Sequence, residues 1–542
     1  MLHDLAKGPR TSEITGAVCV VGGGLAGLVL GSALARRKVD VVVLESGGSS
    51  HPSGPHDLNE VICTHTRYDG ATRGRARGLG GTGAVWGGAL IPFLPADLES
   101  RPWLGLEPWP VHYQDIARYF RAVEQYFDVE EGSFEEERCD TVAKKPTIYD
   151  LECFSVRLAK WPRHKKRNLR LALWNDICMA EHLRVYVNAT AVDMVLCNDG
   201  WSVLEIQARS PEGNEIRIKA RHFVFAAGAI ESTRLMLLLD RKSGGRVRDL
   251  SPSLGQYFVD HVSMPVGRIR VDKKSALQIL NKLLGFRFGR GTLRSVRFEL
   301  KPAVQRRLGF PSAFAHIAPV PSRQGAYDAL RALVRDIQRG RVPEPRTIGA
   351  IVTDAQYLLR LLDWRLRHKR LPWPDTPTLE VHVVIEQIPS QDRTITLACE
   401  RDRFGVEKAS IHWYVTKEER DALWEIAKCF ARDMNNFFIA SGIGAEVLLG
   451  RAEANDNLAG CDIYHPAGTT RMAVQPEKGV VDENLLVFAI KNVSVVSTSV
   501  FPSLPSANPT FTLLALALRH ADWLSKSLAK HDNAAARSAC RG

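Results

Sequence analysis

A glycine pattern directly after the first apolar segment constrains the fold of this chain more than any other feature. Gly22, Gly24 and Gly27 have the spacing G-x-G-x-x-G behind the run AVCVV, and a second apolar run, VDVVVLES, brings the chain to Glu45. In a strand–turn–helix–strand unit the first glycine permits a tight turn, the second lets backbone approach a pyrophosphate, and the third allows close helix–strand packing. The spacing predicts a parallel α/β sheet that carries a dinucleotide site.

The helix behind this turn is the expected anion site. Free N–H groups and the helix dipole favour a pyrophosphate at its N-terminus. Glu45 ends the next strand, where an acidic side chain can bond ribose hydroxyls. The run GAVCVVGGGLAGLVLGSALA is uncharged and long enough to span a bilayer. Because glycines divide it into a strand, a turn and a short helix, we reject a transmembrane interpretation. The glycine spacing by itself does not separate NAD from FAD.

Length and composition narrow the function classes. A chain of 542 residues exceeds one hydrophobic core, so two joined domains are expected. The net charge of +12 is spread along the chain without a nucleic-acid-binding motif, so no nucleic-acid partner is expected. The ten cysteines show no CxxC pair, which argues against a metal site or a disulfide framework and for a reducing compartment. The N-terminus lacks a secretory signal, and we predict a cytoplasmic protein.

Two stretches concentrate positive charge, 326–341 and 355–370. Both place leucine, valine and isoleucine at helical spacing with arginine between them. Such helices can lie on an anionic membrane surface, here the inner face of a membrane. They can equally pack an apolar face on the protein body, and periodicity leaves both interpretations open.

Several later segments indicate ligand-binding loops and sheets. The glycine-dense segment 73–90 is expected to approach a ligand, because regular elements tolerate so many glycines poorly. The segment HFVFAAGAIESTRLML (222–237) repeats a strand–glycine–helix signal and favours FAD over NAD. The runs LEVHVVIEQIP, RTITLACE and ASIHWYV alternate as strands do, and the turn ERDRFGVE makes the last two a hairpin.

Two polar residues near the C-terminus are the candidate catalytic pair. His465 lies in YHPAGTTRM, and histidine has the unperturbed pKa closest to neutrality, as a general base requires. Asn508 precedes Pro509 in SANPTFTLL. Asparagine is a favoured N-cap and proline a favoured first helical residue, so a helix is expected to begin here. Its N-terminal dipole can stabilise an anion.

Taken together, these segments resemble the glucose–methanol–choline (GMC) oxidoreductase family. The N-terminal fingerprint, GLGGTGAVWGGAL, AAGAIESTRLML, YHPAGTTRM and ANPTFTLLALALRHAD follow one another in the family's order, and the resemblance omits only about 265–375. It implies an α/β fold (α+β overall), with a Rossmann-like FAD-binding domain and an inserted antiparallel-sheet substrate domain. It also implies oxidation of a CH–OH donor.

The resemblance assigns roles to individual positions. His465 falls on the family's active-site histidine and would take the hydroxyl proton while hydride passes to flavin N5. Asn508 falls on the second catalytic position and would bond the developing alkoxide. Where some relatives carry a histidine that binds flavin covalently, residues 82–86 contain none, so we predict dissociable FAD. The residues expected to contact FAD are Gly22, Gly24, Gly27, Glu45, Gly80, Gly81, Gly83, Trp86, Ala227, Gly228, Pro509 and Thr510.

Four further residues have open roles. Asp260 and His261, in GQYFVDHVSMP, lie in a segment that resembles a recurring family motif, and a structural role is as good an interpretation as a functional one. Glu386 and Gln387, in VVIEQIP, are candidates for substrate contact from the sheet above the flavin. As outward-facing strand residues they need no such role.

The predicted organisation divides the chain into alternating parts of two domains. Its parts are 12–108 and 181–260 (FAD-binding), 109–180 (connecting and substrate-domain helical segment), 261–454 (substrate domain), 455–530 (FAD-binding with the catalytic residues) and a disordered tail, 531–542.

We expect an FAD-dependent enzyme that oxidises a small alcohol, such as a sugar or polyol. The electron acceptor is open between oxygen, a quinone and a carrier protein. The alternatives are a non-redox lyase of the same fold, a membrane-surface dehydrogenase that reduces quinone, a flavin-holding interaction protein, and an NAD-dependent dehydrogenase.

Overall fold

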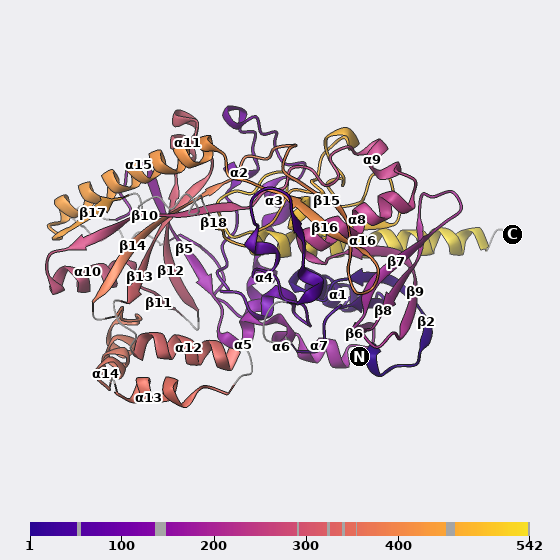
Figure 1. The fold of residues 1–542 in the computed structure, drawn as a ribbon, viewed down its shortest axis with the longest axis horizontal. Coiled ribbons are helices and arrows are strands. Elements are labelled where there is room, and N and C mark those ends of the chain that lie inside the picture. Colours follow the sequence, from indigo (N-terminus) through magenta and orange to yellow (C-terminus); the bar gives the residue numbers. More distant parts are fainter. Residues whose placement is uncertain are drawn as a thin grey trace.

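A computed structural model describes residues 1–50, 56–135, 148–289, 292–321, 326–338, 342–353, 355–374, 376–450 and 461–539. Two sheets, each with its own hydrophobic core, lie side by side along the long axis of the molecule (Figure 1). The N-terminal fingerprint and the C-terminal helix lie in the half of the molecule that contains the first sheet. The middle of the chain forms most of the second.

The first sheet is mixed and contains the dinucleotide unit. Its order is β1-β6-β3-β2-β9-β8-β7, with β19 beside β9. The strands β1, β6, β3, β2, β9 and β19 are parallel, whereas β7, β8 and β9 form an antiparallel meander. The bounds are β1 Leu2–Asp4, β2 Thr11–Val21, β3 Val41–Leu44, β6 Leu183–Val187, β7 Thr190–Leu196, β8 Val203–Arg209, β9 Glu215–Phe225 and β19 Val493–Val495.

The uncharged N-terminal run folds as the sequence predicted. The end of β2 is buried on both sides, as a central parallel strand requires. Helix α1 (Leu25–Ala35) follows the glycine turn and packs against α16 (Pro509–Ala539), and α8 (Gly228–Lys242) follows β9. Among the described residues, no helix is both long and apolar enough to cross a membrane.

The second sheet is antiparallel, in the order β11-β12-β13-β14-β10-β17, with β5 beside β12 and β18 beside β10. Helix α15 (Lys417–Ser441) packs against it. This helix starts with a reciprocal capping box between Thr416 and Glu419 and ends at Gly442 in the left-handed region. The strand bounds are β5 Phe154–Trp161, β10 His261–Val271, β11 Arg287–Phe288, β12 Leu293–Leu300, β13 Ala313–Pro321, β14 Pro377–Glu386, β17 Ala445–Leu449 and β18 Cys461–Asp462.

The predicted hairpin forms, but it lies outside the substrate sheet. Strands β15 (Thr394–Arg401) and β16 (Glu407–His412) pair antiparallel and join β4 (Ile62–Cys63) in a small sheet. The apolar side chains of this hairpin pack into the first core. The segment 261–454 is therefore not one domain, because alternation predicts a strand without indicating which core its apolar side faces.

Two further segments differ from the predictions, namely the connecting segment 109–180 and the C-terminal tail 531–542. The segment 109–180, expected to be helical, contains the short helices α3 (Tyr113–Ala117) and α4 (Phe120–Phe127), but it also adds strand β5 to the substrate sheet. Helix α16 continues to Ala539, through most of the tail that we predicted to be disordered. The run AAARSA is rich in alanine, and extending an existing helix needs no new nucleation.

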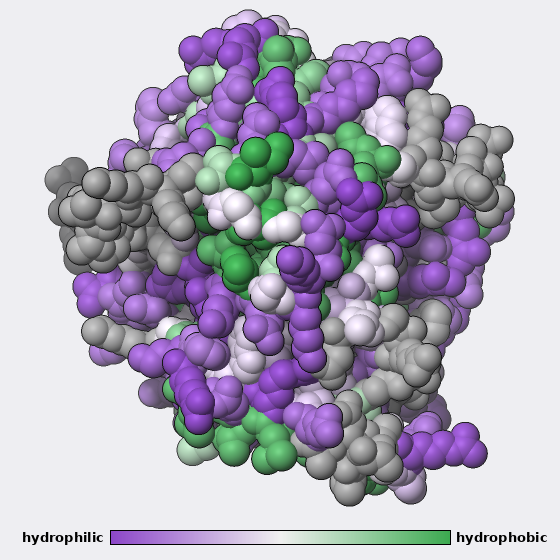
Figure 2. Space-filling view, turned by 90° about the vertical axis from the view of Figure 1, so that its left-hand side faces the viewer, coloured by the Kyte–Doolittle hydropathy of each residue, from purple (hydrophilic) through white to green (hydrophobic). Residues whose placement is uncertain are grey.

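Three helices form a lobe below the substrate sheet in Figure 1: α12 (Ala326–Gln338), α13 (Pro345–Thr353) and α14 (Ala355–Asp363). A π-helical turn, Trp364–His368, extends α14. The two basic stretches correspond to α12 and α14, whereas α13 was not predicted. On the face turned to the viewer in Figure 2, apolar side chains gather near the middle and again at the lower edge, at the height of this lobe. The remaining α-helices are α2 Pro95–Leu98, α5 His164–Arg167, α6 Leu169–Ala172, α7 Trp174–Met179, α9 Arg246–Leu250, α10 Lys274–Leu284 and α11 Pro302–Leu308.

Candidate active site

The three fingerprint glycines meet the packing demands expected of them. Gly22 has φ +113°, and a Cβ there would lie 2.5 Å from the carbonyl oxygen of Ala226. A Cβ on Gly27 would lie 1.9 Å from the carbonyl oxygen of Gly22. Gly24, the N-cap of α1, has no neighbour within 4 Å of an added Cβ and no side-chain cap. The helix N-terminus therefore offers free N–H groups beside open space.

Glu45 joins the fingerprint to the glycine-dense loop. Its carboxylate accepts hydrogen bonds from the backbone N–H groups of Gly23 (3.0 Å), Gly47 (2.8 Å) and Gly78 (3.0 Å). Burial raises the pKa of this carboxyl, against the lowering effect of the three donors. Glu45 thus holds two loops together, and its ribose contact stays a prediction.

The loop from Gly80 to Trp86 packs over the start of α1. The N–H of Gly80 donates to the carbonyl of Gly23 at 2.8 Å. An added Cβ on Gly81 would lie 2.9 Å from Cα of Gly24, and one on Gly83 would lie 2.3 Å from the Leu25 side chain. The Trp86 indole N–H donates to the carbonyl of Arg167 at 3.1 Å, which fixes the end of the loop.

Of the remaining predicted cofactor residues, Ala227 and Gly228 lie at the same strand ends. Gly228 has φ +77°, and a Cβ on Gly22 would lie 2.7 Å from Cα of Ala227. Pro509 and Thr510 begin α16, the helix that packs on α1. Segments far apart in the sequence therefore meet at the carboxyl ends of β2 and β9, the place where ligands bind in open α/β sheets.

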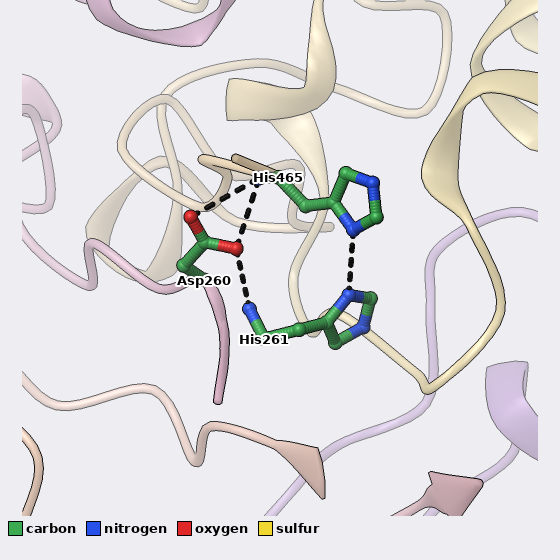
Figure 3. Close-up of side chains that lie close together, drawn as sticks. All are labelled: Asp260, His261 and His465. Carbon is green, nitrogen blue, oxygen red and sulfur yellow. Dashed lines mark hydrogen bonds between the residues drawn. The ribbon is translucent and has the colours of Figure 1, made fainter. Parts of the chain in front are cut away.

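His465 is held by a buried carboxylate. Its backbone N–H donates to both oxygens of Asp260, at 2.9 and 3.1 Å (Figure 3). The same carboxylate accepts from the backbone N–H of His261 at 2.6 Å and from the Tyr68 hydroxyl at 2.5 Å. Asp260 therefore fixes the backbone of both histidines, and a bridge between Val259 and Ala467 holds the loop beyond them.

The two imidazoles form a chain whose tautomers are fixed by their partners. Nε2 of His261 lies 2.8 Å from the carbonyl oxygen of Pro505 and 3.2 Å from that of Leu504. Carbonyls only accept, so Nε2 of neutral His261 carries the proton and Nδ1 carries the lone pair. Nδ1 of His465 lies 2.9 Å from this atom and must donate to it (Figure 3). In neutral His465 the free lone pair is then on Nε2.

Burial keeps both rings neutral. It lowers the pKa of His261 to about 4, and the nearby Arg297 charge acts in the same direction. Burial also lowers the pKa of His465 well below its usual 6.5, with smaller contributions from His261 and Arg297. At neutral pH His465 is consequently ready to accept a proton.

Asn508 is oriented by a buried arginine of β12. Arg297 Nη1 donates to Asn508 Oδ1 at 2.8 Å, and Nη2 donates to the carbonyl of Ser506. A guanidinium has no acceptor, so the oxygen of the Asn508 amide faces it and the NH₂ group points elsewhere. The Arg297 guanidinium stacks 3.4 Å from the Phe314 ring centroid and pairs with Glu299 at 3.0 Å. Burial lowers the pKa of Arg297 to about 10.

The candidate pair thus presents complementary groups. His465 offers a lone pair on Nε2, and Asn508 offers amide N–H donors. A hydroxyl group needs one acceptor for its proton and one donor for its oxygen. Both side chains are arranged around the segment 504–508, through His261 on one side and Arg297 on the other.

Glu386 and Gln387 are buried and committed to internal contacts. Both Glu386 oxygens pair with the Arg101 guanidinium, at 2.5 and 2.7 Å. Gln387 accepts from the Asp260 N–H at 3.1 Å and from the Trp413 indole at 2.7 Å. These contacts give no support to the predicted substrate contact, and the burial of both side chains shows that they are not outward-facing strand residues.

Asp260, His261 and His465 place potential metal-ligand atoms within 4.8 Å of one another. Their hydrogen bonds account for this proximity: the carboxylate accepts backbone N–H groups, and His261 Nε2 donates to carbonyls. We therefore interpret the group as a hydrogen-bonded support for His465. A cavity of about 440 Å³ between β7, α8 and the β15–β16 hairpin contains none of these residues.

Comparison with known proteins shows which families and enzymes this chain is similar to. A family profile described as GMC oxidoreductase matches residues 389–517, and one described as an NAD(P)-binding Rossmann-like domain matches residues 20–56. Paromamine 6'-oxidase of Streptomyces fradiae is 23% identical, over 95% of this chain and 92% of its own. The dehydrogenase str4 of Strobilurus tenacellus is 24% identical, over 93% of each chain. Residues 389–517, which include His465 and Asn508, thus match the GMC oxidoreductase family.

Solved structures support this fold. Formate oxidase of Aspergillus oryzae, in structures that include variants studied for their effect on FAD modification, superposes with a TM-score of 0.56. It covers 97% of this chain and 100% of its own at 15–16% identity. At this identity the likeness concerns the fold alone.

The protein is thus an FAD-dependent oxidoreductase acting on CH–OH donors. The residues around the fingerprint fit FAD, because the uncapped start of α1 at Gly24 faces open space where backbone can approach a pyrophosphate. One residue of the GMC site was missed from the sequence. Arg297 lies in the stretch without recognised motifs, and an isolated arginine in a strand carries no signal of burial.

Proposed function

We propose that this GMC oxidoreductase oxidises an alcohol, with His465 as the base that takes the hydroxyl proton and Asn508 as the donor to the alcohol oxygen. The observation that carries the proposal is the hydrogen-bond chain from Pro505 through His261, which places the lone pair of neutral His465 on Nε2. When bound, FAD would supply the acceptor for the hydride of the substrate carbon.

The surrounding residues support these roles. Asp260 holds the backbone of His465, so the ring loses little freedom when it accepts the proton. The Asn508 amide is already turned with its N–H groups away from Arg297, and a preoriented donor stabilises a developing alkoxide without reorganisation. The positive charge of Arg297 favours the same anionic character.

We further propose that FAD is held without a covalent bond. The chain between Thr82 and Trp86 contains no histidine, and the loop is anchored by packing on Gly24 and by the Trp86 indole. Acid precipitation followed by absorbance of the supernatant tests this. Release of the flavin supports dissociable FAD, and yellow colour retained in the pellet contradicts it.

The substrate class that we propose is a small alcohol such as a sugar or polyol. The two full-length relatives are named an oxidase and a dehydrogenase, which supports a redox reaction but leaves the acceptor open between oxygen, a quinone and a carrier protein. An anaerobic screen of sugars, polyols, sterols, and aliphatic and aryl alcohols for flavin bleaching identifies the donor.

The His465→Ala variant is the control in this screen. Bleaching by wild type and about 10²–10⁴-fold slower bleaching by the variant support the proposed base. Equal rates contradict it. A lyase or a flavin-holding interaction protein would show no bleaching with any alcohol, and a purified protein without a flavin spectrum would point to an NAD-dependent dehydrogenase.

A further inference from the structure

The lobe formed by α12, α13, α14 and the π-helical turn is a separate layer of the molecule, here called the helical lobe (residues 326–370). It projects from the open side of the substrate sheet (Figure 1). Its described contacts with the body involve one side of the lobe. The Lys369 carbonyl accepts from the Phe288 N–H at 2.7 Å, and the Leu371 N–H donates to Phe286 at 3.1 Å.

Helix α14 is apolar on two opposite faces. Tyr357 and Trp364 lie seven residues apart on the inner face and are buried. On the other face, Leu359, Leu362 and Leu366 are 68%, 56% and 70% exposed. A surface helix of a globular protein normally has polar residues on its outer face. The three leucines therefore mark an interaction surface rather than the outside of an ordinary packed helix.

The neighbouring segment extends this apolar surface. Ile348 of α13 is 50% exposed, and Val342, which precedes the helix, is 91% exposed. Apolar side chains appear at the lower edge of the face in Figure 2, where α13 and α14 lie. Single exposed apolar residues are common, but several within one small lobe are typical of a site that contacts another apolar phase.

Positive charge accompanies these apolar residues. The segment 326–370 contains ten Lys and Arg residues against five Asp and Glu residues. Arg365, Arg367 and Lys369 are exposed on either side of Leu366. Arg367 pairs with Asp363 at 2.8 Å, and the Arg365 guanidinium lies 3.6 Å from the Phe288 ring centroid. The leucine face is therefore bordered by cations.

We propose that the helical lobe binds the surface of an anionic lipid bilayer, with Leu359, Leu362 and Leu366 in the acyl boundary and the flanking cations at the headgroups. Helices bind in this way when an apolar face is bordered by Lys and Arg, because burial of apolar area and attraction to anionic lipid act together. A face with leucines alone would fit a second copy of the chain equally well. The excess of cations favours an anionic surface.

This placement has a consequence for the reaction beyond the proposed chemistry. The lobe belongs to the substrate side of the molecule, so binding would hold that side at the membrane. Donors or acceptors that dissolve in lipid would then be concentrated near the enzyme. Membrane binding is independent of the assignment of His465 as the base and of Asn508 as the donor.

Vesicle flotation with purified holoenzyme tests the proposal. We expect the enzyme to float with vesicles of phosphatidylcholine and phosphatidylglycerol, to stay behind with phosphatidylcholine alone, and to lose binding as salt is raised, since salt screens the headgroup attraction. The proposal is overturned if the enzyme fails to float with the anionic vesicles, or if it binds both vesicle types equally at all salt concentrations.

Two sets of variants locate the surface. Leu359→Ser/Leu362→Ser/Leu366→Ser should weaken binding by about tenfold or more, and Arg365→Gln/Arg367→Gln/Lys369→Gln should weaken it and reduce its salt dependence. The matched control, Leu204→Ser/Leu250→Ser/Leu308→Ser, changes leucines that are also exposed but lie elsewhere, and should bind as wild type does. Equal binding by the leucine variant and its control contradicts the assignment.

Activity with a soluble dye acceptor separates this proposal from the catalytic one. In the lobe variants, flavin bleaching by substrate and turnover should equal those of wild type. His465→Ala should float with the anionic vesicles as wild type does but should fail in turnover. Light scattering tests the alternative that a second copy of the chain binds to this face. A concentration-dependent dimer that the leucine variant abolishes, without vesicle binding by wild type, would assign the face to a second copy.

Discussion

Nδ1 of His261 lies 2.9 Å from Nδ1 of His465, so one ring nitrogen must donate to the other. The carbonyls of Leu504 and Pro505 decide the direction, because they accept the proton of His261 Nε2. The donor is then His465, and the lone pair of its neutral ring is on Nε2. A residue that touches no substrate in this scheme therefore sets the tautomer of the proposed base.

The first prediction concerns this positioning role. His261→Ala should lower kcat by about 10²-fold, since the His465 ring loses its anchor and a small misplacement of a reacting group is costly. KM should change little. His261→Gln offers a side-chain oxygen that can accept from His465 Nδ1, so it should recover part of the rate. Stopped-flow flavin reduction measures both, and a His261→Gln rate no higher than that of His261→Ala would contradict a role in accepting the His465 proton.

Arg297 should act on both members of the pair. Arg297→Met frees the Asn508 amide to rotate, and we expect a rate loss of about tenfold or more. Because the Arg297 charge lowers the pKa of His465, its removal should raise that pKa and move the acid limb of the pH–rate profile to higher pH. Arg294→Met is the matched control, since Arg294 lies in the same strand and pairs with Glu130 instead. A pH profile of Arg297→Met identical to wild type would contradict the electrostatic effect.

A glycine substitution in the fingerprint should distinguish an effect on folding from an effect on cofactor binding. Gly24→Ala meets no protein atom within 4 Å and has an ordinary φ of −80°, so the apoprotein should keep its thermal stability while FAD affinity falls. Gly349→Ala, in α13, also meets nothing within 4 Å and should leave FAD affinity unchanged. Titration of apoprotein with FAD measures the difference. Unchanged affinity in Gly24→Ala would mean that FAD does not approach this backbone.

Glu386→Gln tests the structural interpretation of the buried pair with Arg101. Removing one charge leaves the other uncompensated, and the free energy of unfolding should fall by about 3 kcal/mol or more. Glu446→Gln breaks an exposed pair with Arg270 and should cost about 0.5 kcal/mol or less. Urea unfolding measures both. A Glu386→Gln enzyme with normal stability but a raised KM would restore the predicted substrate contact.

Buried neutral histidines should make the fold sensitive to acid. Burial lowers the pKa of His222 to about 3 and of His520 to about 4. The unfolded chain takes up their protons below about pH 6.5 while the folded protein does not, so their stabilising contribution is complete above that pH and declines as pH falls. His222→Gln should reduce the pH dependence of the unfolding free energy by about 1.4 kcal/mol per pH unit between pH 6.5 and 4. An unchanged pH dependence would contradict the buried neutral state of His222.

Strong local patterns predicted much of the fold. The spacing of Gly22, Gly24 and Gly27 specified a turn, and its apolar flanks specified a strand and a helix. The β15–β16 hairpin followed from alternation and turn residues, whereas the antiparallel substrate sheet was implied by the family resemblance. The hairpin was nevertheless placed in the wrong domain, since alternation carries no information about which core a strand joins.

The candidate site, like the fold, could be predicted only in part from the sequence. His465 and Asn508 were visible in the sequence because each lies in a recognisable segment. The sequence also determined the glycines and the acidic strand end of the dinucleotide unit, since these depend on spacing within one short segment.

Only the tertiary structure decided how the side chains of the candidate pair are oriented. The tautomer of His465 depends on carbonyls of residues 504 and 505 and on a ring more than two hundred residues away in the chain. The orientation of the Asn508 amide depends on Arg297, which comes from a strand of the other sheet. Hydrogen bonds of this kind join residues distant in sequence, and no local pattern encodes which groups will meet when the two cores pack together.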